Sequence, residues 1–172
     1  MPFTGKRMKG FLIDTNILSI FAKADGLSVL CRLLGCEELP ITPSVLDELL
    51  VPLEYGYDFP QKVLDIVEVV AVTKREIEMY EALRLQGRVS TADAEMIMVC
   101  KQRGWLYITM DKVALRVAKT SGVETADLQA LLEAIKRREL LNPEQLRMLI
   151  DRMEQEDRTR LPYKDSILAD EE

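Results

Sequence analysis

The chain has 172 residues, of which 48% are hydrophobic and 30% charged, and its formal net charge is −6. This composition predicts one domain with a substantial core, and no apolar run approaches the length of a membrane span. The acidity is only a weak argument against a nucleic-acid substrate, because three of the acids lie in the tail. The chain has no histidine, so any catalysis depends on carboxylates, lysine, hydroxyl groups or a metal ion.

The N-terminus and the cysteines exclude two further classes of protein. The apolar stretch 11–13 ends at Asp14, which is too early for a signal peptide, and we therefore expect a cytoplasmic protein. Cys31, Cys36 and Cys100 form neither a disulfide framework nor a zinc pattern, so we interpret them as packing residues.

Short apolar runs alternate with helical segments, which predicts an α/β fold with a mostly parallel sheet. The predicted strands are residues 11–13, 39–42, 67–72 and 105–109, and the β-branched run 67–72 is the clearest of them. The predicted helices are 16–23, a segment ending at 34, a helix beginning at Pro43 after Thr42 as cap, and segments within 73–87, 90–104 and 111–122.

The pattern changes after about residue 125. Segments 125–140 and 142–156 predict a helical hairpin, in which Asn142 caps the second helix and Pro143 begins it. We expect a polar, mobile end from about Asp157. The expected division is an α/β domain over 1–125 and a helical extension over 126–172.

Two aspartates follow predicted strands directly. Asp14 follows 11–13, and Asp111 comes two residues after 105–109. Ligands bind at the carboxyl ends of parallel strands, so neighbouring strands would place these acids together. The alternative is that each aspartate only caps the following helix, a role that aspartate favours.

A third acid lies in the first turn of a predicted helix. Asp93 projects toward the apolar face of segment 90–104, whereas Glu95 projects away from it. A carboxylate on a buried face is costly unless it is paired or binds a cation. The alternative is a capping box, in which Asp93 bonds back to the backbone of Ser90.

A fourth candidate lies in the helix that begins at Pro43. Asp47 and Glu48 flank its buried face on opposite edges, and periodicity alone does not choose between them. Carboxylates that gather at one place raise each other's pKa values unless a cation intervenes. Oxygen ligands suit Mg²⁺ or Mn²⁺, which can activate water and neutralise charge at a phosphodiester.

Four stretches, FLIDTNIL, TPSVLDELL, STADAEMIMVCKQRG and LYITMDKVALRVAKTSGV, resemble in order and spacing the motifs of the PIN-domain family over about residues 10–125. The helices that follow resemble the C-terminal extension of one prokaryotic PIN subfamily. The resemblance implies a three-layer α/β/α sandwich with a central parallel sheet. It also implies metal-dependent endoribonuclease chemistry.

The resemblance assigns roles to particular residues. The metal-binding and catalytic acids it implies are Asp14, Glu48 (rather than Asp47), Asp93 and Asp111. The polar residues that flank these acids are Thr15, Asn16 and Thr109, and Glu95 would be an outer acid. Lys112 and Arg116, one turn apart, are candidate contacts to the RNA backbone, with a solvated helix face as the alternative.

Many prokaryotic PIN proteins are toxins paired with an antitoxin protein, and PIN proteins often dimerise, so the resemblance predicts a homodimer. A phosphatase of the haloacid dehalogenase type would need an acid at Asn16 and is discounted. A DNA nuclease is a nearer alternative. The alternative from another class is a non-catalytic PIN-fold module for RNA binding or assembly, whose C-terminal hairpin covers a dimer seam, receives a partner helix or packs on its own domain.

Overall fold

The computed structural model describes residue 3 and residues 9–169. The strands are β1 (Phe11–Ile13), β2 (Leu39–Ile41), β3 (Val67–Val69), β4 (Leu106–Ile108) and β5 (Thr125–Ala126). The helices are α1 (Thr15–Lys23), α2 (Leu27–Leu34), α3 (Pro43–Glu54), α4 (Phe59–Leu64), α5 (Lys74–Arg84), α6 (Thr91–Arg103), α7 (Lys112–Thr120), α8 (Leu128–Arg137), α9 (Pro143–Glu156) and α10 (Lys164–Leu168).

Every strand pairing in the described part of the chain is parallel. Strand β4 lies between β1 and β5, and β2 pairs with β3. Hydrogen bonds form two sheets, β1-β4-β5 and β2-β3, and the contact between β1 and β2 joins them into one sheet layer with the spatial order β3-β2-β1-β4-β5. Strand β1 is therefore central, and the chain order reverses on its two sides. Ligands of parallel sheets bind beside the carboxyl ends of strands at such a reversal.

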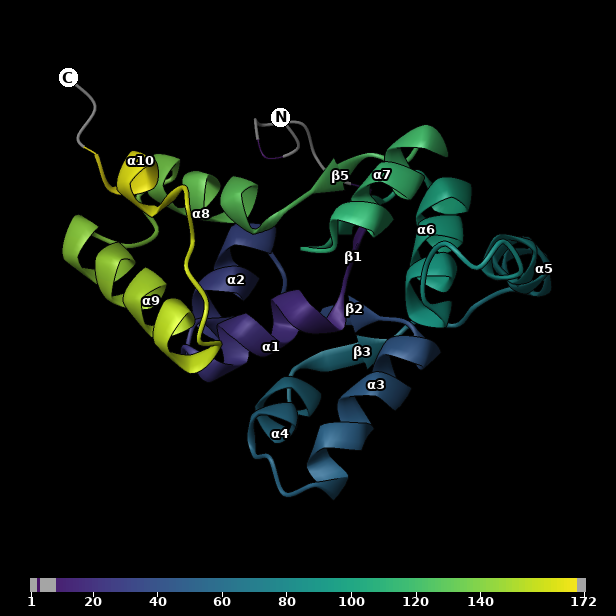
Figure 1. Cartoon of the computed structure of the whole chain (residues 1–172), viewed down its shortest axis with the longest axis horizontal. Helices are drawn as coiled ribbons and strands as arrows, with labels where there is room; N and C mark the ends of the chain where they lie inside the picture. The colour runs from purple at the N-terminus through teal and green to yellow at the C-terminus, as the bar shows by residue number, and fades with distance from the viewer. Residues whose placement is uncertain (1–2, 4–8, 170–172) are drawn as a thin grey trace.

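Helices cover both faces of this sheet and complete the three-layer α/β/α sandwich. Figure 1 shows α1 and α2 together with the C-terminal helices α8 and α9 on one side, and α6 with α5 on the other. The order of helices and strands follows the alternation in the sequence. The predicted fold class is confirmed.

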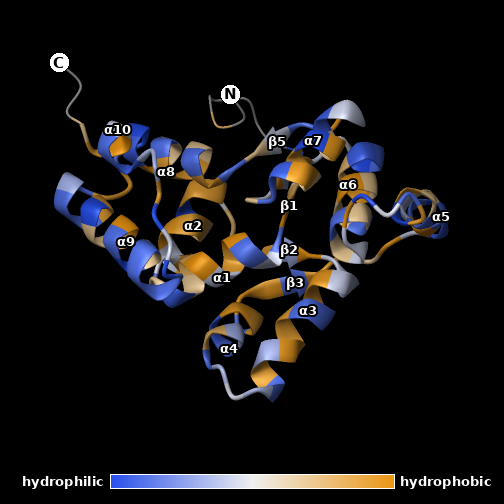
Figure 2. Cartoon of the chain, viewed as in Figure 1, coloured by the Kyte–Doolittle hydropathy of each residue, from blue (hydrophilic) through white to orange (hydrophobic). Residues whose placement is uncertain are grey.

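The core lies between the sheet and these helices. Leu12 and Ile13 in β1 and Ile17 and Phe21 in α1 are fully buried, and α1 and α2 are largely hydrophobic in Figure 2. Cys100 is buried in α6, and all three cysteines are free thiols. Their interpretation as packing residues agrees with this placement.

The C-terminal helices belong to the same core. The apolar residues of the predicted hairpin, Leu131, Leu132, Ile135, Leu146, Leu149 and Ile150, are buried in the chain itself. Helix α9 packs on α1, and α8 packs on α2. These side chains therefore pack on their own domain, as one of the three alternatives predicted.

The described residues after Asp157 are mostly exposed, as expected of a polar end, but they include one further short helix. Helix α10 packs on α8 and α9, and Leu161 before it and Ile167 within it are buried. Asp157 itself binds Lys23 of α1 at 2.7 Å. Most residues of this segment are polar, so the sequence did not indicate that its few apolar side chains pack on the domain.

Three other local features differ from the sequence-based expectation. Strand β3 ends at Val69 instead of Val72, and α4 and the two-residue strand β5 were not predicted. Strand β5 crosses the expected boundary at residue 125. Elements this short show no periodicity that could reveal them. No described helix is long and apolar enough to cross a membrane.

Candidate metal centre

Asp14 lies at the carboxyl end of β1 and is only 4% exposed. Its Oδ1 accepts a hydrogen bond from the backbone N–H of Ile17 at 2.7 Å, which caps α1. Its Oδ2 accepts hydrogen bonds from the hydroxyl of Thr109 and from the N–H of Met110. Asp14 is therefore a helix cap, as the alternative predicted, and it also joins the ends of β1 and β4.

The environment of Asp14 disfavours its charged form. Burial raises the pKa of this carboxyl from 3.8 to about 6, although the hydrogen bonds from Thr109, Ile17 and Met110 oppose the rise. The nearby charge of Asp93 adds a smaller increase. A cation at this position would favour the carboxylate form and so oppose the effects of both burial and the Asp93 charge.

Asp93 lies in the first turn of α6 and is half-buried. The hydroxyl of Tyr107 in β4 donates to its Oδ1 at 2.6 Å, and the hydroxyl of Ser90 donates to its Oδ2 at 2.8 Å. Ser90 also caps α6 by accepting the N–H of Asp93 at 3.1 Å. The predicted cap is present, but the Asp93 carboxylate bonds to the Ser90 hydroxyl instead of its backbone.

Tyr107 was not among the residues predicted from the sequence. It is fully buried in β4, two residues before Thr109. Residues i and i+2 of an extended segment share a face. Because Thr109 was already a candidate beside the acids, the same spacing could have identified Tyr107 as a second hydroxyl on its face. Burial and the charges of Asp93 and Asp14 raise the pKa of the Tyr107 phenol, which therefore remains a hydrogen-bond donor.

Asp111 is exposed at the start of α7. Its Oδ1 accepts the N–H of Ala114 at 2.7 Å and caps the helix, as the alternative predicted. Its own N–H donates to the hydroxyl oxygen of Thr109 at 3.0 Å. Thr109 thus connects Asp111 with Asp14.

Glu48 lies on the exposed side of α3. Its Oε2 accepts a hydrogen bond from the hydroxyl of Thr15, the residue after Asp14. Asp47 is also exposed and forms no hydrogen bond or ion pair with the described residues. The geometry therefore brings Glu48, and not Asp47, to the carboxyl end of β1.

The remaining candidate residues lie at the edge of this region. Asn16 is exposed in the first turn of α1, and Lys112 and Arg116 are exposed on α7 directly after Asp111. The two basic side chains have no ion-pair partner among the described residues. Both side chains are therefore accessible to a phosphate, and the alternative of a solvated helix face stays open.

Hydrogen bonds from hydroxyl groups of neighbouring elements hold the acids near the ends of β1 and β4, but the acids do not form a coordination shell. Within residues 3 and 9–169, no three acids or cysteines converge closely enough to hold a metal ion as they stand. In the same residues, none of Asp14, Glu48, Asp93 and Asp111 pairs with lysine or arginine. Their partners are hydroxyl and amide donors, and carboxylate oxygens are the kind of ligand that Mg²⁺ and Mn²⁺ prefer.

Glu95 departs from the sequence-based expectation. It was expected to project away from the apolar face, but it is only 3% exposed. Its Oε1 accepts the backbone N–H of Ser44 at 3.0 Å. A helical wheel describes one helix alone and does not show its neighbours. Glu95 lies on the polar side of α6, but it is buried because α3 covers that side.

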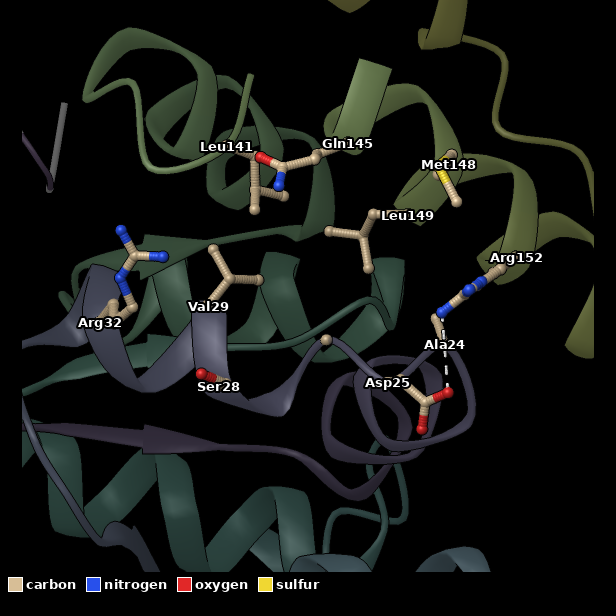
Figure 3. A pocket seen from close by; sticks show the side chains of 11 residues that line it. Ala24, Asp25, Ser28, Val29, Arg32, Leu141, Gln145, Met148, Leu149 and Arg152 are labelled. Carbon is tan, nitrogen blue, oxygen red and sulfur yellow. Dashed lines mark ion pairs between the residues drawn. The ribbon is translucent and has the colours of Figure 1, made fainter. Parts of the chain in front are cut away.

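The structure also has a cavity that is separate from the acids. It has a volume of about 320 Å³ and lies between the α1–α2 turn, α2 and α9. Figure 3 shows Arg32 and Arg152 at its edges and Val29 and Leu149 between them, with Arg152 paired to Asp25 at 3.7 Å. No candidate acid lines this cavity, so it contributes nothing to the carboxylate site.

Comparisons with known proteins agree with this architecture. The family model DUF3368, described as a PIN domain, matches residues 11–166, and the chain belongs to this PIN-domain family. The crystal structure of PAE2754 from Pyrobaculum aerophilum is similar in fold, with a TM-score of 0.53 at 19% identity over 73% of this chain and 96% of that one. No curated protein matches the chain. PIN domains are generally nucleases that require a divalent metal ion, and the family match includes the C-terminal helices.

Proposed function

We propose that the protein is a Mg²⁺- or Mn²⁺-dependent endoribonuclease whose active site contains Asp14, Glu48, Asp93 and Asp111. The position of Asp14 carries this proposal. It is a buried carboxylate at the end of the central strand, tied to the end of β4 and unpaired with any described lysine or arginine. A buried carboxylate without a cation is costly, and a bound divalent ion would offset that cost.

A divalent ion held by these carboxylates would supply an activated water and charge stabilisation at the phosphodiester. Around it, the protein's own hydroxyl groups orient the acids. Thr109 holds Asp14, and Tyr107 holds Asp93. Outer partners of this kind fix the direction of ligand oxygens.

The exposed face beside the site supports an RNA substrate. Lys112 and Arg116 project from α7 next to Asp111 and are proposed to contact backbone phosphates, which positions a strand without reading its sequence. Thr15 is proposed to hold Glu48 for the metal, with Asn16 as a neighbouring polar group.

The narrower form of the proposal is a cytoplasmic homodimer that acts as the toxin of a toxin–antitoxin pair. The family resemblance alone supports it. Growth arrest on expression of the wild type, but not of Asp14→Asn, would agree with it. Light scattering of the purified protein would determine the oligomeric state.

The decisive experiment is cleavage of a labelled mixed RNA by the purified protein in Mn²⁺ and in EDTA. The test variant is Asp14→Asn, because asparagine can still cap α1 but is a poorer metal ligand. The matched control is Asp127→Asn, since Asp127 caps α8 by accepting the N–H of Ala130 at 2.9 Å and belongs to no site. The proposal expects cleavage by the wild type and the control only, and none in EDTA.

Parallel measurements separate the alternatives. Equal cleavage of a matched single-stranded DNA would indicate a general nuclease. Absence of both cleavage and Mn²⁺ binding by calorimetry would favour the non-catalytic PIN-fold module for RNA binding or assembly. Mn²⁺ binding without cleavage would keep the metal site and require a more specific RNA.

A further inference from the structure

Helix α6 carries two carboxylates that connect it to different elements. Asp93 bonds to Tyr107 in β4, whereas Glu95 bonds to the N–H of Ser44 in the first turn of α3. Glu95 is buried and has no lysine or arginine partner in the described part of the chain. Its one hydrogen bond in the described residues therefore joins two helices that are distant in sequence.

The first turn of α3 depends on this bond because its own cap residue does not supply one. Thr42 occupies the N-cap position, but its side chain makes no capping hydrogen bond. The Thr42 hydroxyl is buried and has no partner among the described residues. The first N–H groups of a helix need acceptors from outside the helix, and a negative charge is favoured there. Glu95 fills this role.

The same turn of α3 leads to the proposed site. Glu48 lies four residues after Ser44, one turn along the helix, and reaches the hydroxyl of Thr15 beside Asp14. Movement of the first turn of α3 would move Glu48 with it. Glu95 and Asp93 are two residues apart on α6. This helix therefore carries one proposed ligand, Asp93, and through Glu95 it holds the helix that carries another, Glu48.

We propose that Glu95 is a positioning residue that fixes α3 against α6 and thereby sets the place of Glu48 relative to Asp93. The consequence for metal binding rests on the proposed function. The anchoring of α3 itself does not, since it follows from the bond between Glu95 and Ser44.

Three variants of the full chain separate positioning from general stability. Glu95→Gln keeps an acceptor oxygen for the Ser44 N–H, whereas Glu95→Met retains the length of the side chain and removes the acceptor. Asp127→Ala removes the cap of α8 and serves as the matched control. Circular dichroism melts in EDTA establish that each variant is folded and report any general loss of stability.

Two readouts follow for each folded variant. The first is amide hydrogen exchange of Ser44 and its neighbours in EDTA, and the second is the Mn²⁺ dissociation constant by calorimetry. For Glu95→Met we expect exchange at the start of α3 to be about tenfold faster, as for a lost bond to a charged group. We expect Mn²⁺ binding about tenfold weaker, as for loss of an outer partner of a metal ligand.

Glu95→Gln is expected to resemble the wild type in both readouts. Asp127→Ala is expected to change exchange only in α8 and to leave Mn²⁺ affinity unchanged. Unchanged exchange at Ser44 in Glu95→Met would overturn the inference, as would equal effects of the glutamine and methionine variants. A wild type that binds no Mn²⁺ would instead overturn the proposed function, and the exchange data would still decide the anchoring of α3.

Discussion

The hydroxyl of Tyr107 donates a hydrogen bond of 2.6 Å to Oδ1 of Asp93. Tyr107 is fully buried in β4, and Asp93 belongs to the first turn of α6. The bond therefore fixes a carboxylate of one layer to the sheet. Because the phenol remains protonated, it orients the oxygen of Asp93 without contributing charge.

Tyr107→Phe should weaken Mn²⁺ binding about tenfold, because the Asp93 carboxylate loses the donor that orients it. Calorimetry at pH 7.5 measures the effect. Tyr163→Phe is the matched control, since the Tyr163 hydroxyl has no hydrogen bond in the described structure and lies away from the site. Equal affinities of wild type and Tyr107→Phe would show that Asp93 does not depend on this bond.

Asp14 predicts a pH dependence of stability in EDTA. Its pKa is about 6 in the folded chain, compared with the ordinary value of 3.8, so the folded state holds this proton more tightly than the unfolded state. The Asp14 contribution to the free energy of unfolding therefore falls as pH rises from about 4 to about 6. The full effect is about 3 kcal/mol.

Asp14→Asn removes this titration, so the variant should gain stability relative to the wild type as pH rises. Urea unfolding at pH 4 and pH 7, both in EDTA, measures the difference between the two proteins. A difference that is the same at both pH values would contradict the assignment.

Two buried threonines should respond oppositely to replacement by valine. Thr42 and Thr109 are both fully buried, but the Thr42 hydroxyl has no described partner, whereas the Thr109 hydroxyl bonds to Asp14 and Asp111. Thr42→Val should leave the free energy of unfolding unchanged or raise it by about 1 kcal/mol. Thr109→Val should lower it by about 1–3 kcal/mol. Urea unfolding of both variants makes the comparison, and a large loss in Thr42→Val would reveal a bond to that hydroxyl.

The ion pair between Arg103 and Glu76 should be important for stability. Arg103 of α6 donates two hydrogen bonds, of 2.7 and 2.8 Å, to Glu76 of α5, and the pair joins the two helices. Glu76 is only 1% exposed. Arg103→Met leaves a buried carboxylate without its cation and should lower the free energy of unfolding by about 3 kcal/mol at pH 7. The exposed pair Lys74–Glu78, at 4.0 Å, is the control, and Lys74→Met should change stability by less than about 0.5 kcal/mol.

The effect of Arg103→Met should also depend on pH. Arg103 holds the pKa of Glu76 below its ordinary value of 4.5, so the pair stabilises the folded state at neutral pH. That contribution is lost as the pH falls below this value through the folded-state pKa. Wild type and variant should therefore become more similar in strong acid, and a constant gap in urea unfolding would exclude this origin of the stability.

Local signals in the sequence were sufficient for most elements of the fold. Asp14, Ser90 and Asp111 begin helices in the structure as their side chains predict, and Gly104 ends α6 in a left-handed conformation with φ of 65°. These signals are local because a cap bonds to backbone groups only two or three residues away. The order of strands and helices followed from the same local patterns.

The connections between elements required the tertiary structure. Periodicity left Asp47 and Glu48 equivalent, and only the packing of α3 beside α1 brings Glu48 to Thr15. Tyr107 and Glu95 likewise gain their roles from partners on other elements.

By itself, the sequence determined the class of fold, the helix starts and the set of acids at strand ends, because each of these depends on neighbouring residues in the chain. The tertiary structure decided which carboxylate meets which hydroxyl. Asp14 meets Thr109 across two paired strands, 95 residues apart in the chain. A bond over that separation depends on how strands and helices pack, and no local pattern of residues specifies it.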